Sequence, residues 1–322
     1  MKRAVLTFLI LSFLTSIVLA QFQACDVVLF FTGTLTGSLQ TCKCPGVQHG
    51  AVAHRTTLIK ALLNSKVPYL LLDSGDNFPH YPDPLVSKYI VLSLKKTNYT
   101  AMCPGELEFI LGQNYMVELT KSRQLPFVCA NVKLKQKDRK INLFPEYIVK
   151  NIGRHKVLIT GILSEKVFTP YIKDHTPDIV VEDPVTSLKK ILSRHKNIGF
   201  KILISHAELE ETHAIVNAVE DIDIVFNGHI RYALETPQLV GVNNRTVIVS
   251  VAPRSESIGL MLIYLNSDGR LKEYSWQLVT VSKDIEEDKE VVRIISQYEK
   301  ENAERQKQLL LEHTPTQHNI KK

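Results

Sequence analysis

The 322-residue sequence lacks the features that mark several classes of protein. Its Lys and Arg residues are scattered despite a formal net charge of +6, and no basic stripe with interleaved aromatic side chains supports binding of a nucleic acid polymer. Five cysteines are too few for a small disulfide scaffold, and their odd number leaves at least one thiol free, bound to metal or paired with another molecule. There is no internal repeat. Apolar residues make up 44% of the chain, which is enough for a sizeable core.

The N-terminus is typical of a secretory signal peptide over residues 1–20. A basic start at Met1–Arg3 precedes an apolar or hydroxyl run from Ala4 to Ala20, with small residues for cleavage near Ala20. A run of this length is short for a membrane anchor, and no later segment is long enough to span a bilayer. Attachment of a lipid at Cys25 is an alternative, although the residues before it match a lipobox poorly. We therefore expect a secreted or periplasmic protein without a membrane span after cleavage.

Short apolar runs alternate with helical patterns along the chain. The runs are too short for core helices and rich in β-branched residues, so we predict buried strands. They cover 27–31, 69–72, 156–159, 200–204 and 222–226. Helices are expected between several of them, at 53–64, 185–195 and 208–219. This alternation predicts an α/β layered fold.

The last part of the chain changes character. Leu239–Val251 and Ser257–Leu265 have the pattern of a strand hairpin, which suggests a second or mixed sheet. Residues 283–313 are dense in charged residues and Gln, with an early apolar stripe, and predict a C-terminal helix that docks at its start and is solvated later. Residues 314–322 are expected to be a disordered tail. The main domain is expected to cover residues 25–282.

Polar residues stand where several of the predicted strands end. Asp73 and Asp76 follow one strand, and His206 and His229 each directly follow another. Taken alone, each residue is more often structural, as a turn residue or a surface histidine, than a ligand. Together they place carboxylates and imidazoles at the carboxyl edge of a sheet, where sites form in α/β folds. Such a set favours a divalent transition metal.

Five blocks of sequence resemble those of the 5'-nucleotidase-type, calcineurin-like metallophosphoesterases. The family blocks LLDxGDxF, AxxxGNHEF, PFLSANV, a strand ending in SH, and DxxxGGHxH match Leu71–Phe78, Ala101–Phe109, Pro126–Val132, Ile202–His206 and Asp223–Arg231 in order and spacing. The resemblance implies the family's N-terminal catalytic domain, a four-layer α/β/β/α sandwich with two mixed sheets. It also implies phosphoester hydrolysis by two metals that share one bridging Asp.

The resemblance maps the ligands of one metal onto residues that can still bind it. The bridging Asp corresponds to Asp76, and the Asn and two His ligands correspond to Glu106, His206 and His229. Glu in place of Asn adds a negative charge. We expect these four residues to hold one divalent metal, such as Zn, Mn or Fe.

The other half of the family's site is lost. The three remaining ligand positions are occupied by Thr34, Thr36 and Arg231, and the catalytic His and its orienting Asp by Leu107 and Ile110. The resemblance therefore implies that hydrolysis is impaired. Arg231 either points inward and binds a phosphate-like group, or is a surface residue.

The cysteines leave further alternatives. Cys42-Lys43-Cys44-Pro45 and the following Gly50–Arg55 are similar to the CGC…GGLARR segment of a UshA-like branch. Cys42 and Cys44 could bind a softer metal or do redox chemistry near the rim of the site, or one of them could pair with Cys25. Cys103 and Cys129 are expected to be small buried residues.

Three functions remain open from the sequence. The first is an exported protein of the metallophosphoesterase fold that binds one metal and hydrolyses nucleotide-like phosphoesters weakly. The second is a non-catalytic pseudoenzyme that binds a small anionic or phosphate-containing ligand, or a protein partner. The third is a thiol or soft-metal protein that uses Cys42 and Cys44.

Overall fold

The computed structural model describes residues 25–41, 47–63 and 67–313. The expected signal peptide, Cys42, Cys44 and the expected tail at 314–322 lie outside the described residues, so these predictions stay open.

A mixed five-stranded sheet forms the first β layer, in the order β14-β13-β1-β2-β3. Its strands are β1 (Val27–Thr32), β2 (Tyr69–Asp73), β3 (Ala101–Met102), β13 (Ser257–Leu265) and β14 (Leu271–Thr280). β1 pairs parallel with β2 and antiparallel with β13. Every residue of β1 is buried, as expected for an apolar central strand that is covered on both faces.

A mixed six-stranded sheet forms the second β layer, in the order β11-β12-β10-β9-β7-β6. Its strands are β6 (Tyr147–Ile152), β7 (His155–Leu163), β9 (Phe200–His206), β10 (Ile224–Gly228), β11 (Gln238–Val240) and β12 (Thr246–Val249). The four central strands run parallel and the two edge strands run antiparallel to them. A third, three-stranded sheet consists of β4 (Val132–Gln136), β5 (Arg139–Asn142) and β8 (Ile179–Val181).

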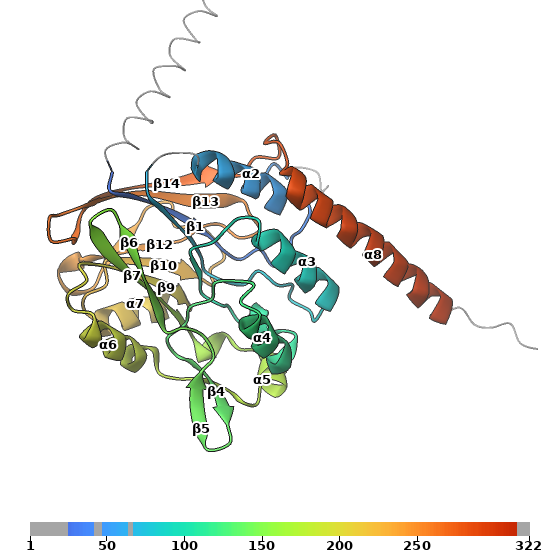
Figure 1. The fold of residues 1–322 in the computed structure, drawn as a ribbon, viewed down its shortest axis with the longest axis horizontal. Coiled ribbons are helices and arrows are strands. Elements are labelled where there is room, and N and C mark those ends of the chain that lie inside the picture. The colour runs from blue at the N-terminus through green and yellow to red at the C-terminus, as the bar shows by residue number, and fades with distance from the viewer. Residues whose placement is uncertain (1–24, 42–46, 64–66, 314–322) are drawn as a thin grey trace, which may run out of the picture.

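Helices cover the outer faces of the two large sheets (Figure 1). On the first sheet lie α2 (Val52–Leu63) and α3 (Pro84–Leu94), and α8 (Lys289–His313) packs along these two helices. On the second lie α6 (Pro184–Arg194) and α7 (Leu209–Ala218). The helices α4 (Gly112–Lys121) and α5 (Pro170–His175) lie near the third sheet. None of these helices combines the length and hydropathy needed to cross a bilayer.

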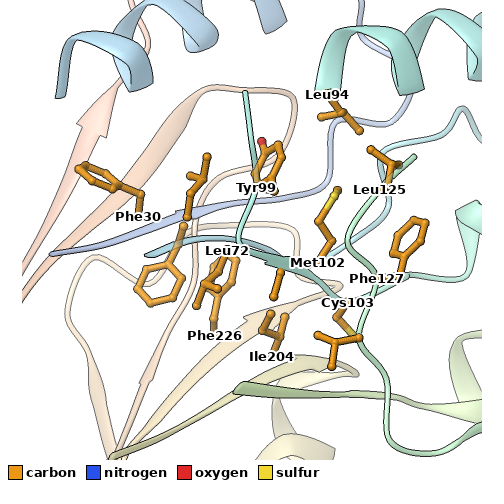
Figure 2. Packing of buried hydrophobic residues seen from close by; sticks show 14 of the residues in the cluster. Phe30, Leu72, Leu94, Tyr99, Met102, Cys103, Leu125, Phe127, Ile204 and Phe226 are labelled. Atoms are coloured by element: carbon orange, nitrogen blue, oxygen red, sulfur yellow. The ribbon is translucent and has the colours of Figure 1, made fainter. Parts of the chain in front are cut away.

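The core lies between the two large sheets. Along β9, Leu203 packs with α6 and α7, whereas its neighbours Ile202 and Ile204 pack toward the first sheet. The rings of Phe31 and Phe226, from opposite sheets, have centroids 4.5 Å apart, and Figure 2 shows Ile204 and Phe226 below Leu72. The predicted four-layer α/β/β/α sandwich with two mixed sheets is therefore confirmed, and the third sheet is an addition to it.

The predicted late hairpin is wrong. β12 pairs with β11 and β10 in the second sheet, whereas β13 pairs with β1 and β14 in the first. The connection carries Pro253 and two residues with positive φ, Arg254 at 55° and Ser255 at 62°. This turn takes the chain from one sheet to the other, so the two strands never pair.

The C-terminal helix begins at Lys289 rather than at residue 283. The Asp288 carboxylate accepts hydrogen bonds from the amides of Glu290 and Val291, both at 3.1 Å, and so caps the helix there. As predicted, the start of α8 is docked, since Val291 is buried, whereas Leu310 near its end is 70% exposed.

Candidate metal centre

Four predicted ligands meet at the carboxyl ends of β2, β3, β9 and β10. Asp76 and Glu106 lie on the loops that follow β2 and β3, His206 ends β9 and His229 follows β10. One ligand atom from each lies within 4.8 Å of the others. Because β9 and β10 are parallel neighbours, with His206 opposite Gly228, the second histidine follows directly beside the first.

The two histidines face the two carboxylates at short range. His206 Nε2 is 2.8 Å from Glu106 Oε2 and 3.4 Å from Asp76 Oδ1. His229 Nδ1 is 3.3 Å from Glu106 Oε1 and 3.8 Å from Asp76 Oδ2. Ligands at tetrahedral positions about 2.1 Å from a zinc ion are roughly 3.4 Å apart, so these spacings suit such an ion.

The second nitrogen of each imidazole is occupied by an outer partner. His206 Nδ1 donates a hydrogen bond to the Ser74 carbonyl, which turns Nε2 toward the carboxylates. His229 Nε2 lies 3.4 Å from Glu208 Oε1, so its Nδ1 faces the cluster. Outer partners of this kind fix the ring orientation and raise the basicity of metal-ligating histidines.

Burial and charge oppose each other in the cluster. Desolvation alone lowers the pKa of His229, but hydrogen bonds with Asp76 and Glu106 outweigh it and raise that pKa to about 9. Desolvation likewise opposes the charged form of Asp76, yet the two histidines hold the pKa of its carboxyl far below the usual range. The site thus favours ionised Asp76, and protons on the imidazoles take the place of a cation.

The backbone at two ligands lies in the left-handed region, at φ 58° for Asp76 and 53° for His229. Non-glycine residues there are uncommon and concentrate at functional sites. The chain also packs closely: a Cβ at Gly105 would come within 2.2 Å of Asp76 Oδ1 and 2.5 Å of His206 Cε1. Only glycine fits beside the cluster at that position.

Glu108 is a supporting residue that the sequence reasoning did not single out. Its buried carboxylate accepts hydrogen bonds from the amides of Gly105 at 2.7 Å, Asn77 at 2.8 Å and Asp76 at 2.9 Å. Desolvation and then the charge of Asp76 raise its pKa to about 8. The only signal for it was its match to the Glu of the family's GNHEF block. It joins the two loops that carry the carboxylate ligands.

Asp73 is a turn residue rather than a ligand. Its buried carboxylate accepts hydrogen bonds from Thr32 Oγ1 at 2.6 Å, Asn77 Nδ2 at 2.8 Å and the Gly75 amide at 2.9 Å. The fully buried Arg55 of α2 offsets part of its charge. Asp73 therefore shapes the loop on which Asp76 lies.

The loop after β1, where the family resemblance implies ligands of a second metal, also has left-handed backbone. Thr34 and Thr36 have φ of 51° and 49°. Their amides donate to the carbonyls of Gly75 at 2.7 Å and Asp76 at 2.8 Å. These hydrogen bonds hold the loop after β1 against the loop that bears Asp76. At the positions where the family resemblance implies Asp and His, this loop has two hydroxyl side chains.

Three other positions named by the family resemblance lie outside the four-residue cluster. Leu107 and Ile110, at the positions where the resemblance implies a catalytic dyad, are buried apolar residues. Arg231 is exposed, and within the described ranges it forms no ion pair with the cluster carboxylates.

The described cysteines near the site lie in the core. Cys103 and Cys129 are fully buried, as predicted, and Cys103 Sγ donates to the Ile162 carbonyl at 3.3 Å. Burial raises the pKa of the Cys103 thiol well above its ordinary value, which opposes formation of a reactive thiolate.

Comparison with known proteins gives relatives for this arrangement. Snake venom 5'-nucleotidase from Naja atra is 26% identical over 282 residues, covering 79% of this chain. The 5'-nucleotidase precursor of Thermus thermophilus superposes on 86% of this chain with a TM-score of 0.75 at 20% identity. The chain is a divergent relative of the 5'-nucleotidases. No family model matches it.

The fold is that of the calcineurin-like phosphoesterases. The protein YfkN from Bacillus subtilis superposes on 86% of this chain, and over 98% of its own length, with a TM-score of 0.72 at 17% identity. The chain spans about half the length of the curated relatives it matches, 52% for the Naja atra protein. At these identities the structural likenesses establish the fold alone.

Proposed function

We propose that this chain is an exported protein of the metallophosphoesterase fold that holds one divalent metal and acts weakly on a phosphate-containing, nucleotide-like ligand. The observation that carries the proposal is the four-residue cluster, whose ligand atoms lie within 4.8 Å of one another. Two carboxylates and two oriented imidazoles form a donor set that suits Zn, Mn or Fe.

A bound divalent cation would polarise a phosphoryl oxygen and neutralise charge on it. The rest of the family chemistry is weakened in this chain, because Leu107 and Ile110 cannot donate a proton to a leaving group. The exposed guanidinium of Arg231 follows His229 closely in the chain and is the candidate contact for phosphate oxygens at the rim. These residues support ligand binding with slow turnover.

Elemental analysis of the purified protein tests the proposal. We expect about one metal per chain, lost in His206→Ala, and slow metal-dependent hydrolysis of an aryl phosphate or a nucleotide. No metal uptake would overturn the proposal. Two metals per chain would show that the assignment of Thr34, Thr36 and Arg231 to a lost half-site is wrong.

A non-catalytic binding role is the second candidate. It is favoured by the joint replacement of the dyad by Leu107 and Ile110 and of two ligands by Thr34 and Thr36. Titration calorimetry should then detect binding of phosphate or a nucleotide, and activity assays should detect no metal-dependent turnover. Turnover that is lost with His206→Ala would exclude it.

Export is part of the proposal. It rests on the signal-like residues 1–20 and on relatives that include a venom protein by name. N-terminal sequencing of the mature protein from the native host should begin near residue 21. An N-terminus that retains Met1 would contradict cleavage.

A further inference from the structure

A small pocket opens directly beside the metal cluster. It has a volume of about 250 Å³, and its walls include Glu106, Leu107, Ile110, Ile172, Tyr81 and Tyr171. Glu106 belongs to both the cluster and the pocket. The amide of Leu107 also donates to Asp76 Oδ1 at 3.1 Å, so this wall of the pocket contacts a ligand of the cluster. A group seated here would adjoin whatever the cluster holds.

The floor of the pocket is apolar. Leu107 and Ile110 are each 4% exposed, and Ile172 of α5 is fully buried. Where the resemblance implies a proton-transferring His and its Asp, this chain has two aliphatic side chains that line a wall. The replacement that removes the leaving-group acid therefore also makes the surface next to the cluster apolar.

The rim of the pocket is aromatic. Tyr171 is 40% exposed and Tyr81 is 58% exposed. The Tyr171 ring stacks on His175, with centroids 4.1 Å apart and planes at 25°, which limits the orientations of the tyrosine. Exposed aromatic rings beside an apolar floor are typical of sites that take a flat apolar group.

Size and charge narrow the ligand class. An apolar cavity of roughly 150 Å³ is enough to hold benzene, so this pocket admits a single ring. Glu106 is the only carboxylate among the residues that line it, and Glu106 faces the cluster histidines. No Lys or Arg is among its described lining residues, and the exposed His80 is the remaining possible partner for a second anionic group.

We propose that this pocket receives a single aromatic ring, or an apolar group of similar size, from a ligand whose phosphate or phosphonate end lies at the metal cluster. The inference rests on the proposed function for the anionic end. It names the substrate class of the same site as small aryl phosphates, and it gives Leu107, Ile110 and Tyr171 a role in specificity.

Calorimetric titration of zinc-loaded protein with phenylphosphonate and with methylphosphonate tests the inference. Both probes carry the same anion, so the ratio of their dissociation constants reports the pocket alone. We expect phenylphosphonate to bind about tenfold more tightly, because its ring leaves water for the apolar floor. Tyr171→Ala should reduce this ratio to about threefold or less, and Tyr171→Phe should retain it.

Tyr232→Ala is the matched control, because Tyr232 is also an exposed tyrosine, 81% accessible, and does not line the pocket. It should leave the ratio unchanged. Zinc uptake with equal affinities for the two probes, or an equal effect of Tyr171→Ala and Tyr232→Ala, would overturn the inference and leave the proposed function standing. Failure to take up zinc in a titration without phosphonate would instead overturn the proposed function.

Discussion

The candidate metal cluster and the neighbouring loop after β1 have a similar backbone and different side chains; we call them the two halves of the proposed centre. In the half that keeps its ligands, Asp76 and His229 have φ of 58° and 53°. In the half where the family resemblance implies ligands that this chain lacks, Thr34 and Thr36 have φ of 51° and 49°. The left-handed conformation is unfavourable for a β-branched residue such as Thr. The surrounding hydrogen bonds, rather than local preference, must therefore impose it on Thr34 and Thr36.

This difference favours the view that the fold positions the backbone of the site and that the side chains decide whether a metal binds. The amides of Thr34 and Thr36 are fastened to the loop that carries Asp76, whatever their side chains are. A likeness in fold thus predicts where a metal would lie but not whether it binds. Substitutions in either half can test this view.

Removing a ligand from the intact half should have the largest effect. His206→Ala leaves the carboxylates of Asp76 and Glu106 facing each other without the imidazole between them. We expect metal affinity to fall at least about 100-fold, since even the loss of outer partners of metal ligands costs 10- to 100-fold. Titration with Zn²⁺ or Mn²⁺ by calorimetry measures this. His213→Ala, a half-buried histidine of α7 outside the cluster, is the control and should bind metal normally.

Restoring the ligands of the lost half should have the next largest effect. The test is a triple variant with the substitutions Thr34→Asp, Thr36→His and Arg231→His. Asp and His adopt the left-handed conformation more readily than Thr, so the backbone of the loop after β1 should be retained. We expect the metal content to rise from about one to about two ions per chain. Elemental analysis after dialysis measures it.

The matched control for this variant is Thr34→Asn, Thr36→Asn, Arg231→Asn. Asn suits the same backbone but is a poor ligand for transition metals. It should keep about one metal. If the variant with the introduced ligands also binds only about one metal per chain, the two halves differ in more than their side chains. That result would contradict the view that the side chains decide whether a metal binds.

The third prediction concerns what holds the intact half in place. Glu108→Ala leaves three buried amides, those of Gly105, Asp76 and Asn77, without their acceptor. We expect the free energy of unfolding to fall by about 3 kcal/mol, measured by urea denaturation in the presence of a chelator. Glu108→Gln should cost less, because its carbonyl oxygen still accepts some of these hydrogen bonds. Equal losses in the two variants would show that the acceptor is not what matters.

Much of the fold, and three of the four members of the candidate cluster, could be predicted from the sequence because they leave local signals. Buried strands appear as apolar runs, and the ligands stand at their ends, so Asp76, His206 and His229 were found from position alone. Glu106 was found only through the family resemblance, since nothing local distinguishes it from other glutamates.

What the sequence did not predict depends on contacts between distant segments. The pairing of β13 with β1 rather than with β12 joins residues more than 200 positions apart, and no local pattern encodes it. The role of Glu108 depends on three amides of two separate loops. The pocket beside Leu107 and Ile110 was not predicted, because one of its sides is formed by Tyr171 and Ile172 of α5, which are distant in the sequence.

The smallest expected effect is a change in the pH dependence of stability at Asp223, which lies outside both halves. It tests the fold without changing the site. Burial raises the pKa of Asp223, the residue before β10, from 3.8 to about 6. A folded-state pKa above the unfolded one adds stability at low pH, and this stability is lost as the pH rises from about 4 to about 6. Asp223→Asn keeps an acceptor for the Lys201 amide, at 2.8 Å in the parent, but cannot ionise. Its free energy of unfolding should therefore gain about 2 kcal/mol on the parent between pH 4 and 6. Urea denaturation of both proteins across this range measures the gain, and parallel pH curves would mean that Asp223 ionises as readily in the folded chain as in the unfolded one.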